Sequence, residues 1–367
     1  MRNIQPALLL AVTLFWVADS LHAEISIKQL VEQARITESD VAVSESPRWK
    51  GAHKILVWDI GMDLSALAKE APGVELIMAE SVEDAAPYAS DVDAMIGFCA
   101  PELVDAAEDL VWIQIYWAGA EQCLSVEDVA DGTVVMSNMQ KMSSPVIAEH
   151  AIAMMMSLAR KLPQFVHSMK NGKKDALFEP RAGMMPIAGK RLLVIGLGGI
   201  GTEVARLGAA LGMRVSGTRN SSRSGPDFVD YVGLSHELNM LAAEADVVVN
   251  ALPLTDATNG LLNEEFFDAI NPGAIFINVG RGKTVVTDAL IAALESGAVA
   301  GAGLDVTDPE PLPSDSPLWK RDNVIITPHV ASAGGERERH AVLLRENLRR
   351  YLAGDRLLNV VDPKKGY

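Results

Sequence analysis

Short apolar runs alternate with more polar stretches along most of the chain from Lys54 onward. An apolar run of this length, bounded by turn residues, is typical of a strand buried on both faces of a sheet. The alternation predicts parallel strands connected by right-handed helical crossovers, and therefore an α/β fold. The expected strands cover, in chain order, residues 54–58, 74–78, 93–97, 111–115, 191–195, 214–218, 246–250, 274–278, 303–306 and 323–327.

The stretches between these runs predict the helices. One helix is expected to start at Ser144-Pro145, because Ser can cap a first turn that also tolerates Pro, and to continue to about Met169. The other main helices are expected at residues 63–69, 101–107, 202–211 and 335–352. Residues 171–186 are rich in Gly, Lys and Pro and predict a loop that links two alternating blocks. Residues 24–50 are expected to form an N-terminal extension with one short helix.

Residues 1–23 have the layout of a secretory signal peptide. Arg2 precedes an uncharged apolar run at residues 6–18, and the small residue Ala23 offers a cleavage point. The run is too short to span a bilayer comfortably, so no stable membrane span is expected in the mature chain. This layout predicts an exported, periplasmic protein, with a cytoplasmic location as the alternative. Residues 1–23 could instead be a wrongly assigned start or an N-terminal core helix.

Composition and charge narrow the class of protein. The chain has 367 residues, of which 32 are basic and 48 acidic, for a net charge of −16. This length suits two domains, and 49% hydrophobic residues can bury a core. The acidic balance argues against a nucleic-acid partner, which needs a basic face. Cys99 and Cys123 are too few to form a metal cage by themselves, and no metal site is expected.

A glycine motif predicts a phosphate-binding turn between the strand at 191–195 and the following helix. Gly196 permits the tight turn, Gly198 lets the backbone approach a pyrophosphate, and Gly201 lets helix and strand pack closely. The helix N-terminus supplies free N–H groups for the anion. The whole motif consists of Gly196, Leu197, Gly198, Gly199, Ile200 and Gly201. The alternative is a glycine-rich turn without a ligand.

The end of the next strand predicts which dinucleotide binds. A site for NAD(H) places an acid near this position to bind the ribose 2′-hydroxyl, whereas here Arg219 follows Thr218. An arginine can pair with a 2′-phosphate through charge-assisted hydrogen bonds. NADP(H) is therefore the expected cofactor, with NAD(H) possible if these are only solvated loop charges. The expected contacts are Arg219, Asn220, Ser221 and Arg223.

With these motifs and those that follow, the chain resembles the D-isomer-specific 2-hydroxyacid dehydrogenase family over residues 54–362. The resemblance rests on the glycine motif and on Ala251-Leu-Pro-Leu-Thr255, Asn278-Val-Gly-Arg-Gly282, Gly303-Leu-Asp-Val306, Asp308-Pro-Glu-Pro311 and Thr327-Pro-His329. Within the family, the Thr218-Arg219 ending looks most like NADPH-dependent glyoxylate/hydroxypyruvate reductases. The resemblance implies a Rossmann-type cofactor domain, a smaller flavodoxin-like substrate domain, and a homodimer.

Three of these residues suit the reduction of a 2-oxo acid, which needs a hydride on the carbonyl carbon and a proton on its oxygen. His329 is the candidate general acid, because imidazole exchanges protons near neutral pH. Glu310, at the family spacing before it, is the candidate partner that orients the ring, with Asp308 as a rival. Arg281 is the candidate for binding the substrate carboxylate and polarising the carbonyl. Singly, each residue has a structural alternative: a buried histidine, a loop charge or a turn brace.

The resemblance also implies further contacts. Leu252 and Pro253 are expected to line the cofactor wall, and Asp305 to accept a bond from the nicotinamide amide. In the first block, Trp117-Ala118-Gly119 resembles the substrate loop, in which backbone N–H groups of Ala118 and Gly119 meet the carboxylate and Trp117 either narrows the pocket or only packs.

The sequence therefore predicts a two-lobed oxidoreductase. The cofactor domain is expected at residues 144–330, and the substrate domain at 51–143 together with 331–367. The expected reaction is hydride transfer between NADP(H) and a small 2-oxo acid or D-2-hydroxy acid, such as glyoxylate or hydroxypyruvate. The alternatives are a dehydrogenase of another small acid and a non-catalytic nucleotide-sensing protein. Export conflicts with the use of a cytoplasmic cofactor; Cys99 and Cys123 would either pair after export or stay free thiols in the cytoplasm.

Overall fold

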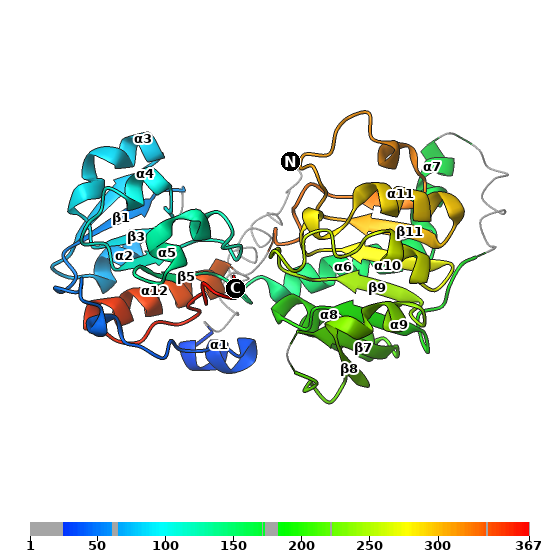
Figure 1. Cartoon of the computed structure of the whole chain (residues 1–367), viewed down its shortest axis with the longest axis horizontal. Coiled ribbons are helices and arrows are strands. Elements are labelled where there is room, and N and C mark those ends of the chain that lie inside the picture. Colours follow the sequence, from blue (N-terminus) through cyan, green and yellow to red (C-terminus); the bar gives the residue numbers. More distant parts are fainter. Residues whose placement is uncertain are drawn as a thin grey trace, which may run out of the picture.

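The structure of the chain is a computed structural model, and it describes residues 25–60, 65–170, 172, 183–220, 222–334 and 337–366. Two lobes of α/β type lie side by side, each built around its own parallel sheet (Figure 1). The expected signal peptide and most of the expected linking loop lie outside the described residues. Within the described residues, no helix is long and apolar enough to cross a membrane.

The first lobe holds a five-stranded parallel sheet in the order β2-β1-β3-β4-β5. Successive residues of a strand face opposite sides, so Ile55 and Val57 of β1 pack toward α2, α1 (Ile27–Ala34) and α12 (Arg337–Ala353), while Leu56 packs toward α3 and α4. The strands are β1 Lys54–Trp58, β2 Glu75–Ala79, β3 Ala94–Ile96, β4 Trp112–Gln114 and β5 Val135–Ser137. The helices are α2 Ser65–Glu70, α3 Val82–Ala85, α4 Pro101–Val104 and α5 Glu127–Ala130.

The second lobe holds a seven-stranded parallel sheet in the order β12-β11-β10-β9-β6-β7-β8. The order reverses between β6 and β9, which is the arrangement of a doubly wound dinucleotide-binding sheet. Helices α6 and α8 cover one face, and α9, α10 and α11 cover the other. The strands are β6 Arg191–Ile195, β7 Arg214–Arg219, β8 Tyr231–Leu234, β9 Val247–Asn250, β10 Ala274–Asn278, β11 Val299–Leu304 and β12 Val324–Ile326. The helices are α6 Ser144–Ala159, α7 Leu162–Lys170, α8 Gly199–Ala210, α9 Leu238–Ala242, α10 Glu264–Ala269 and α11 Thr287–Ser296.

The prediction of one unbroken helix from 144 to 169 was wrong. The chain leaves the helix after Ala159, Lys161 adopts a positive φ of 55°, and α7 starts at Leu162. Pro163 explains the break, because a proline inside a helix removes an N–H donor and clashes with the carbonyl of residue i−4, here Ala159. Strands β5 and β8 were not predicted, and the other expected strands differ from the observed bounds by a few residues at most.

The N-terminal extension packs on the first lobe and contacts the C-terminal segment. It forms α1 Ile27–Ala34, and its Glu38 pairs with Leu358 in an isolated antiparallel bridge. Helix α12 Arg337–Ala353 packs against α1 and α2, so it returns to the first lobe after the second sheet is complete (Figure 1). Buried polar contacts fix it there: the Tyr351 hydroxyl donates to the Asp93 carboxylate over 2.7 Å.

Candidate active site

The glycine motif forms a tight turn that opens α8. Gly196 adopts a φ of 92°, and its N–H donates to Thr218 Oγ1 on the neighbouring β7 over 3.1 Å. A Cβ at Gly201 would lie 2.0 Å from the Gly196 carbonyl oxygen, so only glycine fits where helix and strand meet. A Cβ at Gly198, the N-cap of α8, would meet nothing within 4 Å. The first turn of α8, which includes Ile200, therefore presents open N–H groups where a phosphate can approach.

Gly199 lies where the glycine turn meets the segment between the two lobes. A Cβ there would lie 2.7 Å from Ser144 Oγ and 2.9 Å from Lys141 Cγ. Lys141 itself has a φ of 71° and donates from Nζ to the Arg35 carbonyl over 2.6 Å. Burial lowers the pKa of the Lys141 amine. The start of α6 therefore packs directly against the phosphate-binding turn, and Lys141 connects this region to the N-terminal extension.

The two predicted arginines at the end of β7 differ in their surroundings. Arg223 pairs with Glu237 Oε2 at 2.8 Å and donates to the Tyr231 hydroxyl at 2.9 Å. The hydroxyl of Tyr231 and the Leu234 N–H, together with Arg223, lower the pKa of Glu237 to about 2. Arg219, in contrast, forms no ion pair among the residues that the structure describes, and its buried Nε has no hydrogen-bond partner there. Its guanidinium is therefore not committed to an acid of the chain, whereas a 2′-phosphate contact by Arg223 stays a prediction.

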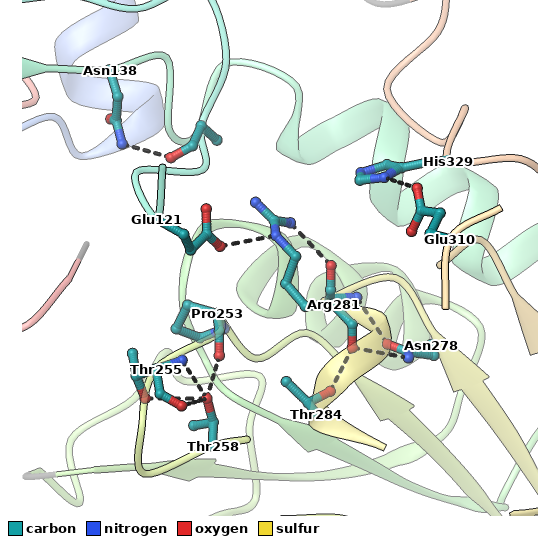
Figure 2. Close-up of polar contacts among 12 residues, drawn as sticks. Glu121, Asn138, Pro253, Thr255, Thr258, Asn278, Arg281, Thr284, Glu310 and His329 are labelled. Carbon is teal, nitrogen blue, oxygen red and sulfur yellow. Dashed lines mark hydrogen bonds and ion pairs between the residues drawn. The ribbon is translucent and has the colours of Figure 1, made fainter. Parts of the chain in front are cut away.

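The remaining predicted cofactor residues follow strands β7 and β9. Asn220 follows β7 directly, and Ser221 lies outside the described residues. Leu252 and Pro253 follow β9, and Leu252 faces the glycine turn, since a Cβ at Gly196 would lie 3.1 Å from Leu252 Cδ2. The Pro253 carbonyl accepts from Thr258 Oγ1 over 2.7 Å, which fixes this loop (Figure 2).

A buried network of polar side chains holds the backbone of Arg281 at the end of β10. Asn250 Nδ2 donates to Asn278 Oδ1 over 2.9 Å and to Thr284 Oγ1 over 2.8 Å. Thr284 Oγ1 and Asn278 Nδ2 both donate to the Arg281 carbonyl, at 2.7 and 3.3 Å. The guanidinium Nη1 donates to the Gly280 carbonyl over 3.0 Å. These bonds leave the guanidinium pointing away from the sheet edge and toward the first lobe (Figure 2).

Arg281 reaches an acid of the first lobe that the sequence interpretation missed. Its Nε donates to Glu121 Oε1 over 3.0 Å, and both side chains are about one third exposed. A Cβ at Gly119 would lie 2.5 Å from Arg281 Nη2, so the guanidinium touches the backbone of the predicted substrate loop. The one signal in the sequence was the position of Glu121, directly after that loop. This ion pair joins residues 160 positions apart across the two lobes.

His329 and Glu310 form the predicted pair. His329 Nδ1 lies 2.7 Å from Glu310 Oε1, and both side chains are more than 40% exposed. The carboxylate takes up Nδ1, so Nε2 is the ring atom left to exchange a proton with a ligand. In Figure 2 the guanidinium of Arg281 lies between Glu121 and this pair. The three predicted catalytic residues follow β10, β11 and β12, which are adjacent strands of one parallel sheet.

Asp305 has partners in the protein that were not predicted. Its Oδ1 accepts from Thr327 Oγ1 at 2.7 Å and from the Val330 N–H at 2.9 Å, and its Oδ2 accepts from the Ala331 N–H at 3.1 Å. The side chain is only 3% exposed. Asp305 therefore holds the loop that carries His329, and its contact with a nicotinamide stays a prediction.

The predicted substrate loop follows β4 and is held by the two residues that follow β5. Asn138 Nδ2 donates to the Ala118 carbonyl over 2.7 Å, and the Met139 N–H donates to the Trp117 carbonyl over 3.0 Å. Gly119 touches Arg281, as described above. Trp117 is 36% exposed and lies edge-on to Trp58, with ring centroids 6.2 Å apart.

A disulfide joins Cys99, after β3, to Cys123 beside this loop, with Cα atoms 5.4 Å apart. The two cysteines are thus paired rather than free thiols. Within the described residues, no group of three His, Cys, Asp or Glu side chains is arranged to hold a metal ion.

Comparison with known proteins identifies the family. The family model for the NAD binding domain of D-isomer specific 2-hydroxyacid dehydrogenases matches residues 152–331. A glyoxylate reductase from Korarchaeum cryptofilum is 32% identical over 307 residues, which cover 82% of this chain and 90% of that protein. The chain belongs to the D-isomer-specific 2-hydroxyacid dehydrogenase family. It is accordingly an NAD(P)-dependent oxidoreductase, and the resemblance noted in its motifs is confirmed.

Solved structures of this dehydrogenase family share the two-lobed fold. A family member from Xanthobacter autotrophicus, in complex with NADPH and MES, is 32% identical and superposes with a TM-score of 0.74, covering 86% of this chain and 100% of that one. An NADPH-dependent glyoxylate/hydroxypyruvate reductase from Sinorhizobium meliloti, in complex with NADP and sulfate, is 27% identical with a TM-score of 0.73 over 86% of this chain and 100% of that one.

The residues of the present chain fit a nicotinamide dinucleotide. The open N-terminus of α8 at Gly198 suits a pyrophosphate, and Arg219, whose Nε has no partner in the described part of the chain, lies at the end of β7, where the ribose of a bound dinucleotide reaches. The carboxyl ends of β9 and β10 then place Leu252 and Arg281 along the path toward His329.

Proposed function

We propose that this protein reduces a 2-oxo acid to the D-2-hydroxy acid with NADPH, and that it catalyses the reverse oxidation with NADP⁺. The observation that carries this proposal is the placement of Arg281 and the His329–Glu310 pair at the carboxyl ends of three adjacent strands. Such a reduction requires a guanidinium that binds the substrate carboxylate and a side chain that donates a proton to the carbonyl oxygen.

Each residue has a definite part in the proposed reaction. Arg281 binds the substrate carboxylate and polarises the neighbouring carbonyl, aided by the backbone N–H groups of Ala118 and Gly119. The bound nicotinamide supplies the hydride, which carries two electrons to the carbonyl carbon. The C=O π bond breaks, and its oxygen takes a proton from Nε2 of His329. Glu310 holds Nδ1 and balances the positive charge of the protonated ring.

The preference for NADP(H) is proposed from Arg219. No described residue forms an ion pair with its guanidinium or a hydrogen bond with its buried Nε, and the planar guanidinium of an arginine matches the oxygens of a 2′-phosphate. The NADPH and NADP complexes of the two structural relatives agree with this choice. Glyoxylate and hydroxypyruvate are the first substrates to test, because curated relatives carry the name glyoxylate reductase.

A nucleotide-sensing role without catalysis is the second candidate. The intact His329–Glu310 hydrogen bond argues against it, since a pure sensor has no need of an oriented proton donor. Turnover with any 2-oxo acid would exclude sensing as the sole role.

Export is proposed from the disulfide. Bonded cysteines are typical of oxidising compartments outside the cytoplasm, and the pairing of Cys99 with Cys123 agrees with the interpretation of residues 1–23. Fractionation of cells that express the full chain tests this. The homodimer implied by the family is tested by size-exclusion chromatography with light scattering.

The reaction is tested by following NADPH oxidation by the chain from residue 24 onward with glyoxylate, hydroxypyruvate, pyruvate and phenylpyruvate, and again with NADH. Turnover that favours NADPH supports both the reaction and the role of Arg219. Turnover that favours NADH overturns the cofactor preference alone. Tight nucleotide binding without turnover of any 2-oxo acid overturns the enzymatic proposal in favour of sensing.

A further inference from the structure

A pocket of about 450 Å³ opens at the carboxyl end of the first-lobe sheet. Its lining includes Trp58 at the end of β1 and Phe98 just after β3. These two strands are neighbours in the sheet order β2-β1-β3-β4-β5, and the order reverses between them. Open α/β sheets bind ligands outside the carboxyl ends of their strands at such a reversal point.

The pocket shares a wall with the anion-binding side of the active site. Trp117 and Gln122 line it, and they flank the loop whose Gly119 touches Arg281. A substrate whose carboxylate lies against Arg281 and this loop can therefore extend its side chain past Trp117 into the pocket.

The walls are aromatic and held in place. Trp58 stacks on Phe98 with centroids 5.6 Å apart and an interplanar angle of 22°, and Trp117 meets Trp58 edge-on. Trp58 Nε1 donates to the Glu80 carbonyl over 3.1 Å, and the Tyr116 hydroxyl donates to the Trp58 carbonyl over 3.0 Å. The rings thus form a preformed apolar surface, which suits a flat hydrophobic group.

The charge of the pocket lining disfavours substrates whose side chain carries a phosphate or a second carboxylate. Glu102 is the only charged side chain among the described residues that line it. A phosphate or a second carboxylate would enter this pocket without a cation to pair with, and next to an acid.

The disulfide stabilises the same pocket. Cys99 lines it and is bonded to Cys123, just after the substrate loop. The bond ties the wall after β3 to the wall after β4, so the pocket is organised before substrate binds.

From these observations we infer that this pocket takes the side chain of the substrate, and that the preferred substrates are monoanionic 2-oxo acids with a bulky apolar, above all aromatic, side chain. The inference rests on the proposed reaction, and it names the substrate class that the same active site selects.

The first experiment compares kcat/KM with NADPH for phenylpyruvate, 4-methyl-2-oxopentanoate, glyoxylate and 3-phosphohydroxypyruvate. Burial of an aromatic ring should favour phenylpyruvate over glyoxylate by about tenfold or more, and 3-phosphohydroxypyruvate should be the poorest substrate. A preference for glyoxylate or for the phosphorylated acid overturns the inference while it leaves the proposed reaction standing.

The second experiment fills the pocket. Ala100 lines it and is half-buried, so Ala100→Phe should lower the ratio of kcat/KM for phenylpyruvate to that for glyoxylate by about tenfold. Ala106→Phe is the matched control, because Ala106 is exposed and lies outside the pocket lining. An unchanged ratio in Ala100→Phe, or an equal change in the control, overturns the assignment of the pocket.

A binding measurement separates this inference from the proposed reaction. D-3-phenyllactate is titrated into the NADP⁺ complex by calorimetry, with the wild-type chain and with Ala100→Phe. Binding that weakens in the variant supports the pocket even if turnover is absent. The absence of binding by the wild-type chain overturns it.

Discussion

Asp305 holds the backbone on both sides of His329 by accepting hydrogen bonds through its carbonyl and its carboxylate. The His329 N–H donates to the Asp305 carbonyl over 2.8 Å, and Asp305 Oδ1 accepts from the side chain of Thr327 and the backbone of Val330. His329 has a φ of 53°, a conformation that costs of the order of 1 kcal/mol for a residue with a Cβ. The proposed proton donor therefore depends on a buried acid for its position.

Asp305→Asn should lower both stability and turnover. An amide in place of the carboxylate leaves at least one buried N–H facing another donor, at a cost of about 1–3 kcal/mol, and it loosens the His329 loop. Urea unfolding and kcat measure the two effects. Asp40→Asn, at an exposed position, is the control and should change neither. A loss of stability with unchanged kcat would show that Asp305 does not position His329.

His329→Ala should abolish most turnover without loss of the nucleotide. Removal of a general acid costs about 10²- to 10⁴-fold in rate, whereas the glycine turn and Arg219 lie on other strands. NADPH binding is followed by the quenching of protein fluorescence, and turnover by absorbance. Glu310→Gln should have a smaller effect, because the ring keeps a hydrogen-bond partner. Near-normal turnover in His329→Ala would refute the role of the histidine.

Glu121→Gln should lower KM for 2-oxo acids by about twofold to fivefold, with little change in kcat. Glu121 pairs with the guanidinium of Arg281, so a substrate carboxylate has to compete with it. Added salt should reduce the difference between variant and wild type, because the pair is partly exposed. Glu127→Gln, exposed on α5, is the matched control. A rise in KM would instead make Glu121 part of the substrate site.

Arg219→Ser should raise KM for NADPH by about tenfold or more and leave NADH kinetics nearly unchanged. The estimate follows from the loss of charge-assisted hydrogen bonds worth about 1.5–3 kcal/mol. Steady-state kinetics with both cofactors measure the switch. Arg214→Ser, at the exposed start of the same strand, controls for a general loss of positive charge. Equal effects on both cofactors would overturn the 2′-phosphate assignment.

Replacement of both Cys99 and Cys123 by Ser should destabilise the fold by about 3 kcal/mol. The bond closes a loop with a sequence separation of 24, and its loss restores conformational freedom to the unfolded chain. Urea unfolding with and without dithiothreitol measures the effect. The reductant should destabilise the wild-type chain and leave the double variant unchanged. Equal stability of the two chains would show that the bond contributes nothing to the fold.

Much of the fold and the proposed catalytic set followed from local patterns. Buried parallel strands such as β6 and β10 are continuous apolar runs, and their predicted bounds match the observed ones. Arg281 and His329 come directly after expected strands, and the carboxyl ends of parallel strands gather at one edge of the sheet. Strands β5 and β8 were not predicted; in β8, Gly233 interrupts the apolar residues of the strand.

The amino-acid sequence by itself determined the family, the α/β class and the residues proposed for catalysis, because each depends on neighbours along the chain. Only the tertiary structure decided which of these residues already have partners. It forms ion pairs between Glu121 and Arg281 and between Glu237 and Arg223. It also brings the Asp305 carboxylate into hydrogen bonds with the loop that carries His329, and it joins Cys99 to Cys123 in a disulfide. The physical reason is that an ion pair or a disulfide depends on the distance between two side chains in space, and the packing of separate strands and loops sets that distance.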